Sequence, residues 1–308
     1  MGTPQFAADS LRALVDARHD VRGVVTRPDA AAGRGRPVRP SAVKALATEL
    51  GLRVMQPAGV RSEGFHRDVA ALAPDVVVVV AFGRILPRPL LDVAPLGAVN
   101  VHASLLPKYR GAAPIAWAIA GGERETGVTT QRMIERLDAG DILLQRAIPV
   151  APDDTAATLE RRLASLGSSV LVETLAGLGS GTIVPQPQDE SLATHAPPLT
   201  KEDGRIDWGQ AAHVIEARVR AFDPWPGAHL TLPRGGKRLI VWKARPEPGP
   251  FAREPGTVAE VSPEVVVACE GGEGLALLEV QPEGRRRMAG AAAAAGRYLL
   301  PGDRLGRP

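Results

Sequence analysis

The chain has little of what disulfide-rich, metal-binding or membrane proteins need. Its 308 residues include a single cysteine, Cys269, which excludes an internal disulfide and a cysteine-based metal site. No segment approaches the ~20 apolar residues of a membrane-spanning helix. The first residues lack the basic region and the apolar core of a signal peptide. These absences predict a soluble, cytoplasmic protein.

Over the chain as a whole the positive and negative charges nearly balance, and the formal net charge is only +3. From Gly204 to the end, 15 Lys and Arg face 12 Asp and Glu, so the whole excess lies in the last third. Residues 27–44 form a second basic segment, with Asp29 as its one acidic residue. Such segments suit a polyanionic partner. A genome that favours Arg, Ala, Gly and Pro would give the same excess, so charge alone does not decide.

The first part of the sequence alternates apolar segments with helical patterns. The continuous apolar run at 76–81 is typical of a central parallel strand that is covered on both faces. Further strands are predicted at 21–26, 54–56, 98–102, 128–132 and 142–148, and helices at 7–15, 41–50 and 155–178. This order predicts an α/β fold with a Rossmann-like, doubly wound, mostly parallel sheet. Its ligand crevice is expected beyond the carboxyl ends of the strands.

The second part has a different pattern. Residues 179–203 fall in a stretch rich in Gly, Pro, Ser and Gln, which predicts a linker between a first domain at 1–178 and a second at 204–308. In the second domain a helix is predicted at 211–221 and a closing helix at 288–299. Short strands are predicted between them, at 228–232, 238–244, 257–261, 265–268 and 275–280. Short strands separated by turns indicate a small β-barrel.

Three residues supply complementary groups for acyl-transfer chemistry. Asn100 and His102 lie two apart on a predicted strand and so project from the same face, and Asp138 follows on a glycine-containing loop. An imidazole can move a proton near pH 7, an amide N–H can hold a developing oxyanion, and a carboxylate can orient the imidazole. No serine or cysteine nucleophile is needed if the attacking amine belongs to a substrate. Taken singly, a strand-end Asn or a loop Asp is more often a turn residue.

Five blocks of sequence, in consistent order, resemble the folate-dependent formyltransferases. The blocks are residues 2–7, 33–37, 100–115, 137–141 and 222–226. The resemblance runs nearly end to end and is closest to the members that act on methionyl initiator tRNA. It implies a formyltransferase fold with an open, OB-like barrel as a tRNA-binding second domain. The implied reaction moves the formyl group of 10-formyltetrahydrofolate to the α-amine of methionyl-initiator-tRNA for translation initiation, without a metal, in a monomeric enzyme.

The resemblance also implies roles for individual residues. Asn100 would hold the formyl oxygen, His102 would handle the proton of the attacking amine, and Asp138 would position His102. The folate donor is expected to contact Phe82, Gly83, Ile85, Leu86, Pro87, Ser104, Leu105, Leu106, Pro107 and Asp141. The tRNA is expected to contact Arg34, Arg36 and Arg39 in the basic loop, and Arg234, Lys237, Arg238 and Lys243 in the second domain. Ile85 and Leu86 could equally be plain core, and a solvated hairpin would explain the second-domain cations nearly as well.

In one place the sequence departs from the resemblance. A strand is expected before Gly2, where only Met1 is present. That strand would be central in the sheet, so its loss would expose two strand edges. Either the start is assigned too late, which we favour, or this form of the protein folds poorly. Two other functions remain open: a sugar-nucleotide amine formyltransferase, which shares residues 104–111, and a tRNA-binding remnant without activity. The basic loop and the second domain favour the tRNA substrate over the sugar nucleotide.

Overall fold

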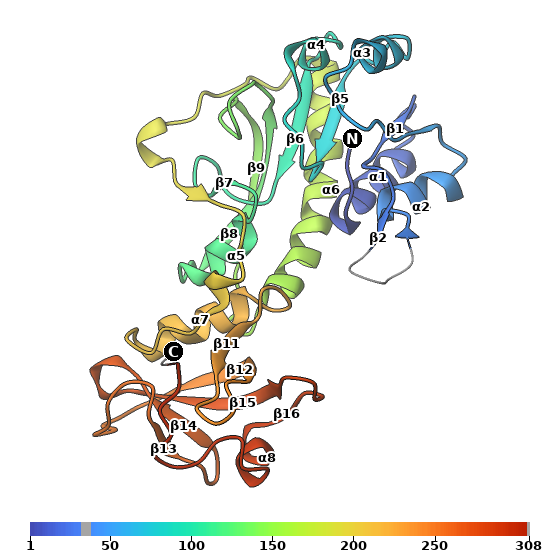
Figure 1. Cartoon of the computed structure of the whole chain (residues 1–308). Helices are drawn as coiled ribbons and strands as arrows, with labels where there is room; N and C mark the ends of the chain where they lie inside the picture. The colour runs from blue at the N-terminus through green and yellow to red at the C-terminus, as the bar shows by residue number, and fades with distance from the viewer. Residues whose placement is uncertain (32–37, 307–308) are drawn as a thin grey trace. The chain divides into compact units, whose positions relative to one another are not determined.

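The computed structural model describes residues 1–31 and 38–306, which divide into two compact units (Figure 1). Unit 1 comprises Met1–Pro114, Glu125–Pro149 and Glu160–Pro197. Unit 2 comprises Ile115–Arg124, Val150–Leu159 and Pro198–Pro308. The segment that follows the long helix α6 (Ala156–Ser180) therefore belongs to unit 1 as far as Pro197.

Unit 1 contains the α/β part of the chain. Besides most of α6, its helices are α1 (Gln5–Asp16), α2 (Ala42–Glu49), α3 (Glu63–Ala70), α4 (Arg88–Leu91) and the 3-10 helix η1 (Glu190–Leu192). Its strands are β1 (Val24–Val25), β2 (Ala30–Ala31), β3 (Val38–Arg39), β4 (Val54–Met55), β5 (Val77–Val80), β6 (Ala98–His102), β7 (Arg110–Gly111), β8 (Glu125–Arg132), β9 (Ile142–Pro149) and β10 (His195–Ala196). The strand predicted at 98–102 and the helix predicted at 155–178 are confirmed. The short pairs β2–β3 and β7–β10 were not expected.

The main sheet of unit 1 has the order β5-β6-β8-β9. β5 and β6 are parallel, with Val79 opposite Asn100, whereas β8 runs antiparallel to both β6 and β9. The sheet thus departs from the mostly parallel order predicted from the sequence. The connection at 133–141 accounts for the antiparallel β8–β9 pair, because a parallel pair needs a crossover of a dozen or more residues. It does not account for the antiparallel β6–β8 pair, since the connection at 103–124 is long enough for a crossover.

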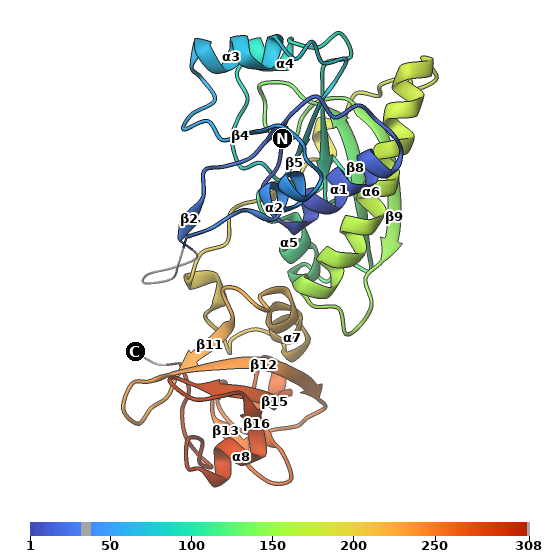
Figure 2. The same ribbon diagram turned by 90° about the vertical axis from the view of Figure 1, so that its right-hand side faces the viewer.

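Helix α6 packs along the main sheet, with α1 beside it (Figure 2). At Gly167 of α6, an added Cβ would lie 3.1 Å from Cγ1 of Val101 and 3.5 Å from Cζ of Phe6, so the helix approaches β6 and α1 closely. The hydroxyls of Thr130 and Thr174 join β8 to α6 at 2.7 Å. By length and composition α6 could cross a membrane, but it is tied into this unit as a core helix.

Met1 and Gly2 lie between β1 and β5 and are hydrogen-bonded to both. The Gly2 N–H donates to the Val25 carbonyl at 2.9 Å, and the Val80 N–H donates to the Met1 carbonyl at 2.9 Å. The terminal ammonium donates to the Val78 carbonyl at 2.6 Å. A cavity of about 480 Å³ continues beside them along the starts of β1 and β5. The strand edges that were expected to be exposed face this cavity, and β1 and β4 form a separate two-stranded sheet.

Unit 2 is built on an antiparallel sheet that curls into an open half-barrel (Figure 1). Its helices are α5 (Pro114–Ala120), which begins at the last residue of a unit 1 segment, α7 (Ala212–Ala221), α8 (Gly290–Ala295) and the 3-10 helices η2 (Glu202–Gly204) and η3 (Glu270–Gly272). Its strands are β11 (Ala228–Thr231), β12 (Arg238–Glu247), β13 (Val258–Glu260), β14 (Val265–Ala268), β15 (Gly274–Pro282) and β16 (Met288–Ala289). The order is β11-β12-β15-β14-β13, with β16 on β15, around a core that includes Ile215, Leu239 and Leu277.

The closing helix of unit 2 is shorter than predicted. Met288 and Ala289 pair with β15 as a strand, so only Gly290–Ala295 is helical. A side chain at Gly290 would overlap the Leu277 carbonyl, which shows how closely the helix start approaches β15. The alanine run predicts a helix by propensity, and the ladder to β15 overrides that propensity at its first two residues.

Candidate active site

The side chains of Asn100, His102 and Asp138 come together at the end of β6. The Oδ2 atom of Asp138 lies 3.6 Å from Nδ1 of His102. The Nδ2 atom of Asn100 donates to Oδ1 of the same carboxylate at 3.5 Å. The side chains of His102 and Asp138 are 6% and 11% exposed. The structure thus brings together three residues that the sequence analysis selected from two separate blocks.

Asp138 is held by two further donors. The Gly111 N–H donates to Oδ2 at 2.9 Å, and Nε2 of Gln131 donates to Oδ1 at 2.9 Å. Gln131 is opposite Asn100 in the β6–β8 ladder, so the antiparallel pairing delivers both amides to one carboxylate. The backbone of Asp138 has φ 49°, in the left-handed region that costs a non-glycine residue about 1–3 kcal/mol. Its surroundings must supply that energy to keep the carboxylate in place.

The His102 ring is fixed on its other side by the backbone. Its Nε2 atom lies 2.9 Å from the Tyr109 carbonyl oxygen. A carbonyl only accepts hydrogen bonds, so Nε2 carries a hydrogen in this arrangement and Nδ1 of the neutral ring has the lone pair. A proton taken up at Nδ1 would create an imidazolium that faces the Asp138 carboxylate. This geometry is suited to a general base.

The first group of predicted folate contacts, at 82–87, is partly core. Phe82 and Leu86 are each 2% exposed and belong to a hydrophobic cluster that includes Phe65. Ile85 is 63% exposed, so the core alternative holds for Leu86 and fails for Ile85. Gly83 is exposed and Pro87 is half-buried. Only part of this segment is therefore accessible to a ligand, and its buried members can act only by shaping the backbone.

The second group of predicted folate contacts lies on a tightly bonded loop. Ser104 and Leu106 are buried. The Thr129 hydroxyl donates to the Ser104 carbonyl at 2.7 Å and accepts from the Leu106 N–H at 3.1 Å. Gln145 donates from Nε2 to the Leu106 carbonyl at 2.6 Å. The remaining members of the group, all half-buried, are Leu105, Pro107 and Asp141. A rigid loop of this kind can present backbone groups to the edge of a flat ring.

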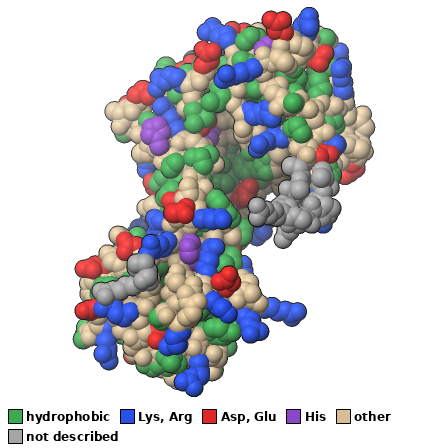
Figure 3. Space-filling model, in the orientation of Figure 1, with side chains coloured by type: hydrophobic (Ala, Val, Ile, Leu, Met, Phe, Trp, Pro, Cys, Tyr) green, Lys and Arg blue, Asp and Glu red, His purple; other side chains and the backbone are tan. Residues whose placement is uncertain are grey.

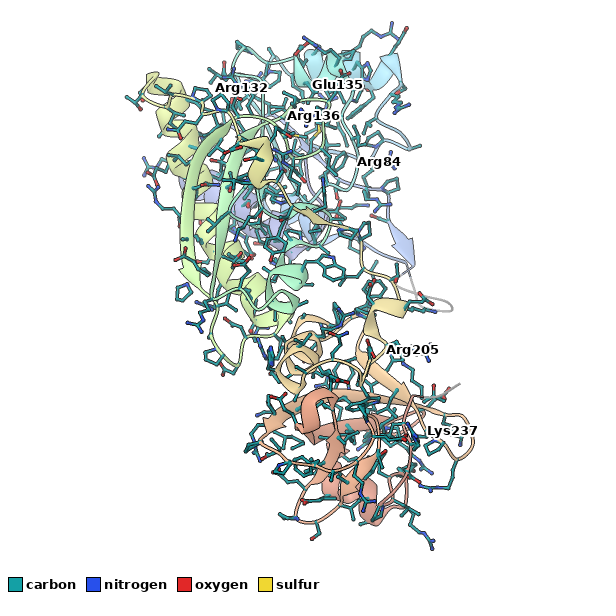
Figure 4. The ribbon with its side chains drawn as sticks, turned by 90° about the vertical axis from the view of Figure 1, so that its left-hand side faces the viewer. Arg84, Arg132, Glu135, Arg136, Arg205 and Lys237 are labelled. Atoms are coloured by element: carbon teal, nitrogen blue, oxygen red, sulfur yellow. The ribbon has the colours of Figure 1, made fainter. Side chains whose placement is uncertain are left out.

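The cations predicted to contact tRNA differ in their exposure and in whether the structure describes them. Arg34 and Arg36 lie outside the described residues, and Arg39 is exposed in β3. In unit 2, Lys237 and Lys243 are exposed, and Figure 4 labels Lys237 at the loop that leads into β12. Figure 3 shows Lys and Arg side chains spread over the visible face of this unit with Asp and Glu among them.

The two predicted arginines of unit 2 are tied to their own unit. Arg234 forms a bidentate pair with Asp303, with N–O distances of 2.8 and 2.7 Å. Arg238 is half-buried and donates from Nη2 to the Pro226 carbonyl at 2.9 Å. These bonds favour a structural role for the two arginines, although Arg234 is exposed like Lys237 and Lys243.

The described residues can also be compared with the needs of a metal site and of a reactive thiol. Within residues 1–31 and 38–306, no three His, Cys, Asp or Glu side chains gather as a metal site. Cys269 is buried in unit 2, and burial raises the pKa of its thiol to about 12. A thiol with such a pKa stays protonated and unreactive at neutral pH.

Sequence reasoning missed three polar residues that surround the site. Gln131 contacts Asp138 directly. Arg110, which is 4% exposed, and Gln188 form a second layer behind the loop that carries Asp138. A polar residue in the predicted strand 128–132 was a signal for Gln131. Gln188 gave no signal, because its surroundings have the composition of a linker.

Two protein-family models together match most of the chain. The family model Formyl transferase matches residues 1–175, and the model of the formyl transferase C-terminal domain matches residues 198–298. The chain belongs to the formyltransferase family. Among similar formyltransferases is the methionyl-tRNA formyltransferase of Solibacter usitatus, 49% identical over 99% of this chain and 97% of the relative. That of Anaeromyxobacter dehalogenans is 52% identical over 92% of each chain.

Solved structures show the same fold at lower identity. WlaRD, a sugar 3N-formyl transferase in the presence of dTDP and 5-N-formyl-THF, has a TM-score of 0.66 and 16% identity, over 92% of this chain and 97% of WlaRD. HypX from Aquifex aeolicus, in complex with tetrahydrofolic acid, has a TM-score of 0.57 and 23% identity. The likeness covers 82% of this chain and 43% of HypX. At these identities the likeness concerns the fold of the formyltransferase alone.

Proposed function

We propose that this formyltransferase transfers the formyl group of 10-formyltetrahydrofolate to the α-amine of methionyl-initiator-tRNA, giving formyl-Met-tRNA for translation initiation. The observation that carries the proposal is the identity of 49% and 52% to methionyl-tRNA formyltransferases over 99% and 92% of this chain. Identity at this level to relatives of that name does not favour a sugar-nucleotide enzyme or a remnant without activity. The donor is a substrate of the reaction.

The residues at the end of β6 supply the groups that this reaction needs. The amine nitrogen attacks the formyl carbon, a C–N bond forms, and the formyl oxygen becomes an oxyanion. Asn100 has a second N–H besides the one directed at Asp138, and this donor can hold the oxyanion. His102 accepts the amine proton at Nδ1, beside the Asp138 carboxylate. When the bond from carbon to N10 of the folate breaks, the proton passes to that nitrogen.

Binding roles follow from the same proposal. The folate would bind in a crevice bordered by the segments 82–87 and 104–107, with Asp141. Arg34, Arg36, Arg39, Lys237 and Lys243 would meet tRNA phosphates. Residues 1–178 would form the catalytic domain and 204–308 an OB-like tRNA-binding domain, in a monomer that works in the cytoplasm. Arginine suits such contacts because its guanidinium pairs with phosphate in a bidentate way.

A transfer assay tests the function. Purified protein is mixed with 10-formyltetrahydrofolate and either methionine-charged initiator tRNA or an amino-sugar nucleotide. We expect formylation of the tRNA, and a loss of about 10²–10⁴-fold in the His102→Ala variant. His19→Ala, at an exposed histidine of unit 1, serves as the matched control and should keep full activity. Transfer to the sugar alone, or to neither acceptor, would overturn the proposal.

A further inference from the structure

The side chain of Gln188 connects the segment after α6 to the loop that carries Asp138. Its Nε2 atom donates to the Asp138 carbonyl at 2.9 Å and to the Gly140 carbonyl at 2.7 Å. Its Oε1 atom accepts from Nε and Nη2 of Arg110 at 3.0 and 2.7 Å. One amide thus joins three parts of unit 1 that are far apart in the sequence.

The direction of the Gln188 amide is fixed by its partners. A guanidinium has only donors and a backbone carbonyl only accepts, so Oε1 must face Arg110 and Nε2 must face the loop. Arg110 is itself 4% exposed and held by Glu190 at 3.0 Å. Glu190 also pairs with Arg136, which lies on the connection after β8 (Figure 4). Arg110, with Arg136, holds the pKa of Glu190 at about 2, so this anchor is charged at neutral pH.

The loop needs such support because its backbone is strained and tightly packed. Asp138 has φ 49°, a left-handed conformation that costs a non-glycine residue energy, although aspartate tolerates it better than most. At Gly140 an added side chain would overlap the Arg132 carbonyl, so the turn passes directly against the end of β8. Gln188 satisfies one carbonyl at each of these two positions, on either side of Ala139.

We propose that Gln188 is a positioning residue of the formyltransferase reaction. By binding the carbonyls of Asp138 and Gly140, it holds the left-handed turn and keeps the Asp138 carboxylate beside His102 and Asn100. The expected effect on the rate of transfer rests on the proposed function. The hydrogen bonds that position Asp138 do not depend on which substrate is bound. On this proposal, the part of the predicted linker that contains Gln188 belongs to the catalytic centre.

The first test compares Gln188→Met with Gln186→Met. Methionine keeps the length of glutamine and removes its donors and acceptor. Gln186 lies two residues earlier, with an exposed side chain, and is the matched control. We expect kcat of Gln188→Met to fall about 10-fold or more, because displacement of a catalytic group by 1 Å can cost 10²-fold. KM for folate and tRNA should stay within about two-fold, because Gln188 is not among the residues proposed to bind either substrate. Unchanged kcat would overturn the inference.

A double-variant cycle separates positioning from general support of the fold. If Gln188 acts through Asp138, adding Gln188→Met to Asp138→Ala should lower kcat by less than about two-fold, because the group that it positions is already gone. A further loss as large as in the wild-type background would show another role and overturn the proposal. Gln188→Glu, which keeps acceptors for Arg110 and removes both N–H donors, should repeat the defect if Gln188→Met does not fold.

Amide exchange at Gly111 gives a readout that does not depend on turnover. This N–H donates to Oδ2 of Asp138, so it should exchange faster in Gln188→Met than in wild type or Gln186→Met. If the wild type transfers no formyl group, the proposed function fails while this measurement still decides the inference. Equal exchange rates in all three proteins would contradict it.

Discussion

At the scale of single residues, the site depends on a few polar groups that the backbone forces together. Asn100 is the only asparagine in the sequence, and it lies on β6 between the parallel neighbour β5 and the antiparallel neighbour β8. That position gives its amide a carboxylate on one side and leaves one N–H for a ligand.

Asn100→Ala should lower kcat by about 10²–10³-fold, because one oxyanion donor is lost. KM for the charged tRNA should change little, since the bond strengthens only when charge develops on the oxygen. Steady-state kinetics with both substrates measure the two effects separately. Gln56→Ala, an amide whose partners are Asp29 and the Arg27 carbonyl, is the control and should leave kcat unchanged. A rise in KM at unchanged kcat would contradict an oxyanion role for Asn100.

At the scale of elements, helix α2 illustrates how local sequence determines structure. Its N-cap is Ser41, whose Oγ accepts from the Lys44 N–H at 3.1 Å. Ser41→Ala should destabilise unit 1 by about 1 kcal/mol, since a helix N–H loses its acceptor. Urea unfolding followed by circular dichroism measures the change. Ser169→Ala, in the middle of α6 with its hydroxyl on the Ser165 carbonyl, should be neutral or slightly stabilising. Equal effects would exclude a capping role.

Patterns of this local kind made much of the fold predictable. The cap at Ser41, the apolar run that forms β5 and the helical period of α6 are all set by neighbours in the sequence. The antiparallel β8–β9 pair follows from the short loop between the two strands, whereas no local pattern in the sequence sets the antiparallel β6–β8 pair. The pairs β7–β10 and β15–β16 depend on partners far along the chain. The contacts of Gln188 escaped prediction for the same reason, because a hydrogen bond across 50 residues leaves no period in the sequence.

At the scale of the whole molecule, the terminal amine links stability to pH. With Met1 as the first residue, burial of its terminal amine lowers the pKa of that group from 8.0 to about 5. Between pH 5 and 8 the unfolded chain binds more protons than the folded one, so stability rises with pH over this window. The contribution of this amine to the free energy of unfolding should fall by up to ~4 kcal/mol as pH drops from 8 to 5, and it should change little below pH 5.

Acetylation of the terminal amine isolates this contribution. It removes the titrating group and keeps one N–H for the Val78 carbonyl. The free energy of unfolding in urea, measured at several pH values, should differ between the two forms by a pH-dependent amount that is largest near pH 5 and vanishes above pH 8. Parallel curves would contradict the burial of this charge.

The distribution of charge also determines how the protein should bind tRNA. The net charge is only +3, so attraction must come from local groups and not from the overall field. We expect kcat/KM for charged tRNA to fall steeply with added KCl while that for folate changes less, because phosphate contacts release counterions. Lys237→Gln and Lys243→Gln should each reduce the slope of log kcat/KM against log salt by about 1. Lys201→Gln, at another exposed lysine of unit 2, should leave the slope unchanged. If all three lysine variants keep the wild-type slope, the hairpin at β12 is a solvated face and the proposed contacts of Lys237 and Lys243 with tRNA are wrong.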